Sequence, residues 1–221
     1  MVIENVENVD QSVLRIPEVF AELSRPIRWR QLESAKSLFL RGSNPYLHSL
    51  ETLGWVDGRL DFSIFLYRER FIADFSYAIP GAEALEALVG YGPIVEIGSG
   101  NGYWGWCLKQ LGCSVRMYDN YSWGLGWTTW WKRPRRGGPS VLRRYGKWTL
   151  FLCWPWSGGK MATECLRYYG GSRVAYIGER GGLCAEGEFF DRLGLEGFKL
   201  VRVIELPHWF GMHDNLFVYE R

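Results

Sequence analysis

Three glycines on alternate residues are the sequence feature that most constrains the fold. Gly98, Gly100 and Gly102 directly follow the apolar run Pro93–Ile97, and a stretch compatible with a helix comes next. Glycine lets the backbone adopt positive φ and approach a ligand closely. A glycine-rich turn between a strand and a helix is typical of a site for a nucleotide-like cofactor.

Strand-like and helix-like segments alternate from Gly81 to the C-terminus. The apolar patterns predict strands at Ile94–Ile97, Ser114–Tyr118, Thr149–Cys153, Arg173–Ile177, Leu200–Leu206 and Asn215–Tyr219. They predict helices at Ala82–Val89, Tyr103–Leu111, Met161–Tyr169 and Glu186–Leu193. This alternation indicates an α/β fold with a doubly wound, mostly parallel sheet and helices on both faces.

The connection between the last two predicted strands is only a few residues long. A parallel crossover needs about a dozen residues, so these two strands must pair as antiparallel neighbours. We therefore expect a sheet that closes with a reversed last strand.

The chain before Gly81 has helical periodicity instead. Apolar residues recur at helical spacing over Val13–Leu23 and Trp29–Phe39, and an aromatic-rich segment covers Phe62–Phe75. We predict an N-terminal helical cap over residues 1–80 and a cofactor-binding domain over residues 81–221.

From Pro80 onward the chain resembles the class I, Rossmann-like S-adenosylmethionine-dependent methyltransferases. The first motif of that family is an acidic residue in the first strand followed by G-x-G-x-G, and here it reads Glu96-Ile97-Gly98-Ser99-Gly100-Asn101-Gly102. The family's second strand ends in an acidic residue that binds the cofactor ribose, and Asp119 ends "SVRMYD". The sheet of this family also closes with a reversed last strand.

The resemblance implies S-adenosylmethionine as the cofactor. It implies that Asp119 accepts the ribose hydroxyls and that Glu96 accepts a hydrogen bond from the methionine amino group or from nearby water. The helix that starts near Gly102 would turn its positive end toward the methionine carboxylate. The implied cofactor-binding residues are Glu96, Gly98, Ser99, Gly100, Asn101, Gly102, Asp119, Asn120 and Cys153.

The stretch Cys153-Trp154-Pro155-Trp156 follows the strand that we expect beside the first one. It is similar in position to the N/D-P-P-Y/F/W motif of amino-methylating enzymes. Cys153 replaces the Asn or Asp that accepts a hydrogen bond from the target amine, and Trp154 replaces the first Pro. Trp156 retains the aromatic that can stack on a planar acceptor. Packing of these tryptophans beneath a loop is an equal alternative.

Few residues could act as a base. His208 and His213 flank the turn between the last two strands, and Glu179 lies just beyond the strand Arg173–Ile177. We name Trp156, Glu179 and His208 as candidate catalytic residues. Many methyl transfers need no base, because positioning a nucleophilic atom supplies most of the acceleration.

The charge pattern leaves the methyl acceptor open. The formal net charge is only +2, but Lys132–Arg136 form a basic run that follows several aromatic residues. Such a run can hold the phosphates of a nucleic acid, although in a near-neutral chain it is more typical of a solvated loop. We predict methyl transfer to a nitrogen or oxygen atom, with a small aromatic acceptor favoured and a nucleic-acid base as the alternative.

Two other functional classes also fit parts of the sequence. Gly100, Gly102 and Gly105 satisfy the G-x-G-x-x-G pattern of a dinucleotide-binding oxidoreductase. That pattern should begin at the strand end, where Gly98 stands, and an acidic Glu96 would repel a pyrophosphate. The third class is a module that binds the cofactor without catalysis.

Composition adds expectations about the environment of the protein. The five cysteines include no C-x-x-C pair, which predicts reduced thiols and no bound metal. The polar N-terminus and the lack of a membrane-length apolar run predict a cytoplasmic protein without a membrane partner. The 12 tryptophans indicate either a broad aromatic cavity or a Trp-rich core.

Overall fold

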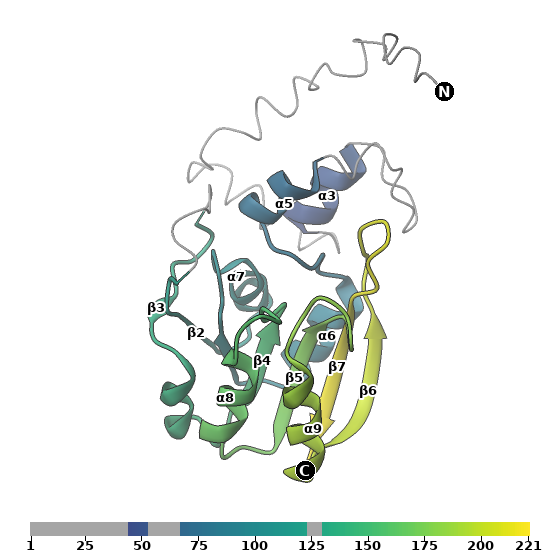
Figure 1. Ribbon diagram of the computed structural model, residues 1–221. Helices are drawn as coiled ribbons and strands as arrows, with labels where there is room; N and C mark the ends of the chain where they lie inside the picture. The colour runs from purple at the N-terminus through teal and green to yellow at the C-terminus, as the bar shows by residue number, and fades with distance from the viewer. Residues whose placement is uncertain (1–43, 53–66, 123–129) are drawn as a thin grey trace, which may run out of the picture.

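The computed structural model describes residues 44–52, 67–122 and 130–221, and within them a seven-stranded sheet forms the centre of the protein (Figure 1). The strands are β1 (Ile94–Ile97), β2 (Val115–Asp119), β3 (Arg135–Arg136), β4 (Thr149–Cys153), β5 (Arg173–Gly178), β6 (Lys199–Glu205) and β7 (Asn215–Glu220). The helices are α3 (Pro45–Thr52), α5 (Arg68–Asp74), α6 (Ala82–Gly90), α7 (Tyr103–Gln110), the 3₁₀-helix η1 (Pro139–Arg144), α8 (Met161–Tyr168) and α9 (Gly187–Leu195).

The strand order is β3-β2-β1-β4-β5-β7-β6. Strands β1 to β5 pair in parallel, whereas β7 runs antiparallel to both β5 and β6. The predicted doubly wound sheet with a reversed last strand is therefore confirmed. The winding direction reverses between β1 and β4, so the carboxyl ends of these two strands border a natural crevice.

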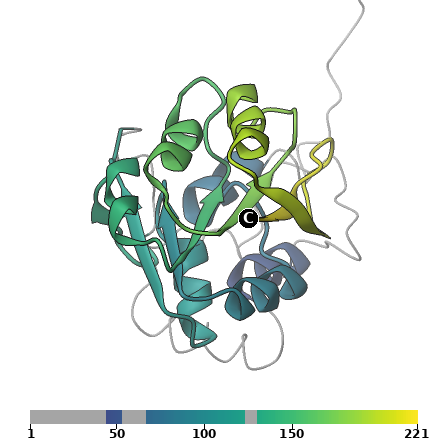
Figure 2. The same ribbon diagram turned by 90° about the horizontal axis from the view of Figure 1, so that it is seen from below.

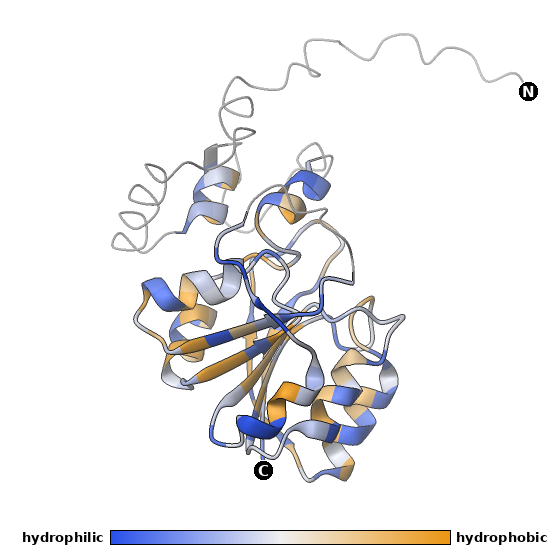
Figure 3. Cartoon of the chain, turned by 90° about the vertical axis from the view of Figure 1, so that its left-hand side faces the viewer, coloured by the Kyte–Doolittle hydropathy of each residue, from blue (hydrophilic) through white to orange (hydrophobic). Residues whose placement is uncertain are grey.

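Side chains of the strands alternate between two cores, one on each face of the sheet. Ile94, Met117 and Phe151 face the core under α6 and α7, whereas Val95 and Leu150 face the core under α8 and α9. Figure 2 shows helices on both sides of the sheet, and Figure 3 shows the strands as mainly hydrophobic. Burial on both faces explains why these strands are short apolar runs rather than alternating patterns.

The described N-terminal helices lie over the carboxyl ends of the parallel strands (Figure 1). Tyr46 of α3 stacks on Phe75 at a centroid distance of 4.8 Å, and the Tyr103 hydroxyl of α7 donates a hydrogen bond to Asn44 Oδ1 at 3.0 Å. The side chains of Tyr46, Phe75 and Tyr103 belong to one hydrophobic core cluster, which also contains Trp209. The described part of the predicted cap thus shares a core with the sheet.

Several elements differ from the sequence-based expectation. Helix α5 lies within the predicted segment Phe62–Phe75, of which residues 62–66 are outside the described residues, as are the predicted helices over Val13–Leu23 and Trp29–Phe39. Helix α3, strand β3 and η1 have no counterpart in the prediction. Arg135 and Arg136 of the basic run form β3, which is exposed and pairs with the end of β2.

The described residues show neither a membrane-spanning helix nor a cluster of metal-ligating side chains. No helix in them has the length and apolar character needed to cross a bilayer. Nor do they bring together three His, Cys, Asp or Glu side chains that could hold a metal ion. All five cysteines are free thiols.

Candidate active site

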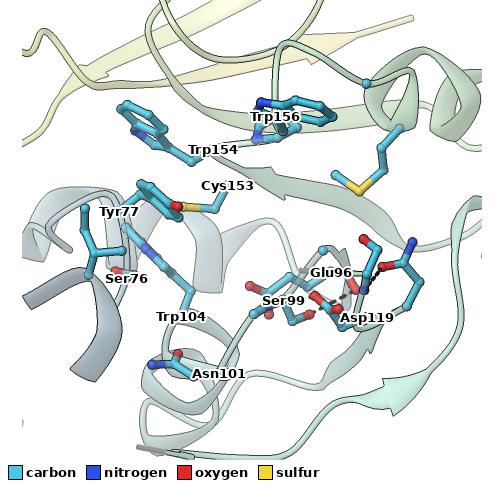
Figure 4. A pocket seen from close by; sticks show the side chains of 18 of the residues that line it. Ser76, Tyr77, Glu96, Ser99, Asn101, Trp104, Asp119, Cys153, Trp154 and Trp156 are labelled. Atoms are coloured by element: carbon cyan, nitrogen blue, oxygen red, sulfur yellow. Dashed lines mark hydrogen bonds between the residues drawn. The ribbon is translucent and has the colours of Figure 1, made fainter. Parts of the chain in front are cut away.

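A cavity of about 620 Å³ lies at the carboxyl ends of the central strands (Figure 4). Its walls come from the loop after β1, the end of β2, the segment after β4 and the connection between α5 and α6. Its volume lies within the range of about 300–1,000 Å³ that is usual for small-molecule and cofactor sites. The position is the crevice expected where the winding of the sheet reverses.

The loop of residues 98–102 depends on left-handed backbone conformations. Gly98, Gly100 and Gly102 have φ values of 74°, 54° and 80°. A Cβ atom at Gly98 would lie 2.9 Å from Met161 Cε, and one at Gly102 would lie 1.9 Å from the carbonyl oxygen of Lys132. Positive φ therefore favours glycine at all three positions, and at Gly102 the backbone of Lys132 also leaves no space for a side chain.

Asn101 fixes this loop to its surroundings. Its side chain is only 2% exposed; Nδ2 donates to the carbonyl of Asp74 at 3.2 Å, and Oδ1 accepts from the Tyr103 amide at 3.1 Å. Its own carbonyl accepts a hydrogen bond from the Trp131 amide at 3.2 Å. Asn101 lines the cavity, but its side chain is engaged in holding the loop and in capping α7.

Asp119 lies at the end of β2, next to the glycine loop. Its Oδ2 accepts a hydrogen bond from the Gly100 amide at 2.9 Å, and its Oδ1 accepts one from the Tyr121 amide at 2.6 Å. Each carboxylate oxygen can accept a further hydrogen bond. Asp119 and Asn120 both line the cavity, so this edge offers oriented acceptors for a ligand.

Glu96 is a carboxyl group buried in an apolar position of β1. It lies opposite Met117 of β2 and Phe151 of β4, and it is 2% exposed. Its Oε2 has no hydrogen-bond partner. Burial raises the pKa of Glu96 to about 8, and a hydrogen bond with the Ser99 side chain offsets only part of this increase. Glu96 is thus mostly neutral at pH 7 and lacks one partner within the described residues.

We call Glu96, residues 98–102 and Asp119 the polar half of the cavity. The aromatic half consists of Tyr77, Trp104, Trp154 and Trp156, which all line the same cavity. Figure 4 shows the two halves side by side, with Cys153 between Tyr77 and the polar groups. Tyr77 and Trp154 stack with a centroid distance of 5.1 Å and an interplanar angle of 12°.

Trp154 is held in an unusual conformation. Its φ of 49° is rare for a bulky side chain and costs about 1–3 kcal/mol. Its amide donates to the Ile177 carbonyl at 2.9 Å, and its Nε1 donates to Asp214 Oδ1 at 2.7 Å. The Arg68 guanidinium lies 5.6 Å from its ring centroid. These contacts fix the indole at the end of β4.

Trp156 lies at the rim of the cavity. It is 55% exposed, so it is not a core residue. A Cβ atom at Gly158 would lie 2.3 Å from its ring, which shows that the following glycines make room for the indole. Cys153, beside it, has a thiol whose pKa burial raises well above the usual value. The group at the position where the N/D-P-P-Y/F/W motif has Asn or Asp is therefore a neutral thiol.

Glu179 and His208 do not line the cavity. Glu179 Oε1 accepts a hydrogen bond from the His213 amide at 2.9 Å, and its Oε2 accepts one from the Leu183 amide at 3.4 Å. His208 lies 3.9 Å from Glu205 through Nε2. Glu179 follows β5 and His208 lies between β6 and β7, and β4 separates all three of these strands from β1.

Sequence reasoning missed two residues of the aromatic half, Tyr77 and Trp104. Tyr77 precedes the sheet region and had no motif around it. Trp104 follows the glycine loop directly, but one tryptophan in a helix gives no signal about its environment. Its indole is 2% exposed, packs edge-on against Phe151 at 5.7 Å, and has no partner for its Nε1.

Comparisons with known proteins give structural likeness only. No protein-family model matches the chain, and no curated protein matches it. One similar solved structure is a magnesium protoporphyrin IX methyltransferase from Synechocystis PCC 6803 with bound SAM, at 15% identity, 75% coverage of this chain, 86% of that chain and a TM-score of 0.46.

Two further structures have comparable likeness. A precorrin-6y C5,15-methyltransferase from Geobacter metallireducens GS-15 has 11% identity, covers 67% of this chain and 94% of its own, and has a TM-score of 0.42. A SAM dependent methyltransferase from Aquifex aeolicus has 15% identity, coverages of 62% and 88%, and a TM-score of 0.35. By its own strand order and reversed β7, this chain has the Rossmann-like methyltransferase fold. Its function has to be inferred from its site.

Proposed function

We propose that this protein is an S-adenosylmethionine-dependent methyltransferase. The observation that carries the proposal is the polar half of the cavity, where one space combines three groups that suit different parts of this cofactor. Asp119 offers carboxylate oxygens for the ribose hydroxyls, residues 98–102 allow close approach of the backbone, and Glu96 offers an unpartnered buried oxygen for the amino group.

Glu96 supports a cofactor with a cationic amine. A buried polar atom without a partner costs about 1–3 kcal/mol, and a bound ammonium group would supply the missing donor. A dinucleotide would instead bring a pyrophosphate toward this region, where the Asp119 carboxylate would repel it. The third glycine of the dinucleotide pattern also has another explanation, because a Cβ at Gly105 would lie 2.2 Å from Met117 Sδ and 2.6 Å from Glu96 Oε2.

The remaining site residues have matching roles in this proposal. Ser99 and Asn101 hold the loop, Asn120 borders the adenosine, and the N-terminal end of α7 suits the methionine carboxylate. When bound, S-adenosylmethionine supplies an electrophilic methyl group for a nitrogen or oxygen atom of the acceptor. Cys153 remains a neutral thiol at the junction of the two halves.

We propose a small aromatic molecule as the acceptor, because the aromatic half adjoins the polar half within one cavity. Catalysis then rests on positioning, for which Tyr77, Trp154 and Trp156 provide the surfaces. We assign no base role to Glu179 or His208, since neither lines the cavity. A nucleic-acid acceptor has less support, because none of Lys132–Arg136 lines the cavity.

Isothermal calorimetry with S-adenosylmethionine and S-adenosylhomocysteine tests the proposal. Both should bind with one-to-one stoichiometry, and NADH should not bind. Failure of both sulfur compounds to bind would contradict the methyltransferase function, and tight NADH binding would favour the oxidoreductase. If the cofactor binds but no methyl transfer to any aromatic or nucleic-acid acceptor follows, the protein is a non-catalytic module.

A further inference from the structure

Two residues that line the cavity each have one buried side-chain polar atom without a hydrogen-bond partner among the described residues. These atoms are Glu96 Oε2 and Trp104 Nε1. The amino group of the cofactor proposed above would supply the missing partner of Glu96 Oε2, but that proposal does not account for the missing partner of Trp104 Nε1. An indole nitrogen is only a donor, so its missing partner must be an atom that accepts a hydrogen bond.

The surroundings of Trp104 are aromatic rather than polar. Figure 4 draws Trp104 on the side of the cavity where Tyr77 and Cys153 lie, with Asp119 on the opposite side. Tyr77 and Trp154 form a stacked pair above it, and Asp214 and Arg68 fix that pair from outside the cavity lining. Flat rings beside the Trp104 Nε1 donor suit a flat ring compound that carries an accepting atom.

The charges that line the cavity favour ligands without negative charge. The charged residues among the described lining are Glu69, Glu96, Asp119, Glu164 and Lys160. Four are acidic and one is basic, so the formal charge is negative even with Glu96 protonated. The N-terminal end of α7 would hold the methionine carboxylate of the cofactor, but a phosphate or carboxylate on a ligand in the aromatic half would be repelled by this field. A neutral or cationic ligand would not.

We infer that the aromatic half is the acceptor subsite, that it takes a flat, neutral or cationic aromatic compound without phosphate or carboxylate, and that Trp104 Nε1 donates a hydrogen bond to that compound. The word acceptor rests on the proposed function, but the class of ligand rests on Trp104, Tyr77 and the lining charges alone. Trp104 is thereby a specificity-determining residue.

Three related probes test the inference, each titrated by calorimetry into the full-length protein at neutral pH with saturating S-adenosylhomocysteine. Quinoline is neutral and has an accepting ring nitrogen, N-methylquinolinium is cationic with that nitrogen blocked, and cinchoninate carries a carboxylate on the same ring system. Quinoline should bind about tenfold more tightly than cinchoninate. Trp104→Phe should weaken quinoline about tenfold and leave N-methylquinolinium unchanged.

The contrast between two probes separates a hydrogen bond from packing. If Trp104→Phe weakens quinoline and N-methylquinolinium equally, the ring only packs and the inference is wrong. Tightest binding of cinchoninate would also overturn it, in favour of an anionic acceptor. Loss of S-adenosylhomocysteine affinity in Trp104→Phe would place the indole at the cofactor instead.

Tyr77→Leu provides a second variant that does not depend on a buried ring. Tyr77 is 38% exposed, so the substitution should fold. It should weaken quinoline and N-methylquinolinium about equally, by roughly fivefold, because both lose the stacking surface. Unchanged affinity for both probes would remove the aromatic half as their site. If the wild-type protein binds the probes but not S-adenosylhomocysteine, the proposed function fails while the ligand class stands.

Discussion

The polar half of the cavity comes from residues 96–102 and from Asp119, whose strands are neighbours in the sheet. The aromatic half takes Tyr77, Trp104 and Trp154 from three segments that meet only in the folded protein. The polar half is shaped by backbone conformation and backbone hydrogen bonds. The aromatic half is shaped by side-chain stacking and by support from distant residues such as Asp214.

This difference indicates that the two halves respond to substitution in different ways. Changes in the polar half should act through loop geometry, charge and cofactor affinity. Changes in the aromatic half should act on ligand binding with smaller effects on the free energy of unfolding, at least at the exposed rim. The following substitutions test that contrast, in order of decreasing expected effect.

Gly102→Ala should have the largest effect. Its Cβ would lie 1.9 Å from the Lys132 carbonyl oxygen, in a left-handed conformation with φ of 80°. We expect a loss of about 4 kcal/mol in the free energy of unfolding, measured by urea titration. Gly112→Ala is the matched control, because Gly112 has a φ of 83° but open space around it, and it should cost only about 1 kcal/mol. Equal losses would mean that backbone conformation alone, and not space, fixes the loop.

Glu96→Gln should change how stability depends on pH. The folded-state pKa of Glu96 is about 8 against 4.5 as the ordinary value, so the folded protein binds more protons than the unfolded chain between these values. The contribution of the Glu96 carboxyl to the free energy of unfolding is fully present below pH 4.5 and is lost as the pH rises toward 8. Between pH 5 and 8 the wild type should lose about 3 kcal/mol relative to Glu96→Gln.

Urea titrations of both proteins at pH 5, 6.5 and 8 measure this difference directly. Other groups, such as Asp214 with its pKa raised by burial to about 6, contribute equally to both proteins and cancel. Parallel pH profiles would show that the Glu96 carboxyl is solvated in solution, against its position in the apolar layer.

Asp119→Ala should weaken S-adenosylmethionine binding by about 2 kcal/mol, the scale of charge-assisted hydrogen bonds. Calorimetry provides the affinity, and the quinoline probe serves as the internal control. Because Asp119 belongs to the polar half, quinoline affinity should not change. Unchanged cofactor affinity in a folded variant would remove Asp119 from the ribose site.

Trp156→Ala should have the smallest effect on stability, below about 1 kcal/mol, because the indole is 55% exposed. It should reduce acceptor binding while S-adenosylmethionine affinity stays the same. Trp154→Ala is the contrasting variant, since it breaks the hydrogen bond to Asp214 and should cost several times more in a denaturant melt. Equal destabilisation by both would assign Trp156 to packing.

The same contrast explains how far the sequence predicts this molecule. Apolar runs bounded by glycine or proline gave the strand limits, as for β1 and β4, whose predicted and observed ends coincide. The short connection before Asn215 was enough to predict the reversed β7, because chain length leaves no other pairing. Backbone rules of this kind act locally, and so they also predicted the glycine turn of residues 98–102, whereas Asp119 was selected from the resemblance to a family motif.

The rest depends on contacts between distant segments, which local patterns do not encode. Nothing in the residues around Tyr77 predicts its stacking on Trp154, and the missing partner of Trp104 Nε1 is visible only in three dimensions. We predicted Glu179 as a site residue because functional groups often lie at the carboxyl ends of strands. In the folded protein, however, both Glu179 carboxylate oxygens accept hydrogen bonds from backbone amides, those of Leu183 and His213, and Glu179 does not line the cavity.

The carbonyl oxygen of Asp74 accepts hydrogen bonds from the Asn101 side-chain Nδ2 at 3.2 Å and from the Trp131 indole Nε1 at 2.7 Å. One backbone atom of α5 thereby joins the glycine loop to the segment between β2 and β3 that contains Trp131. The glycine motif therefore depends on a residue outside itself. A fragment that starts at Gly81 would contain every residue of the motif, but without Asp74 the side-chain donors of Asn101 and Trp131 would lose their shared acceptor. Transplanting the loop into another scaffold would require a carbonyl in the same place, supplied by a segment that the motif itself does not contain.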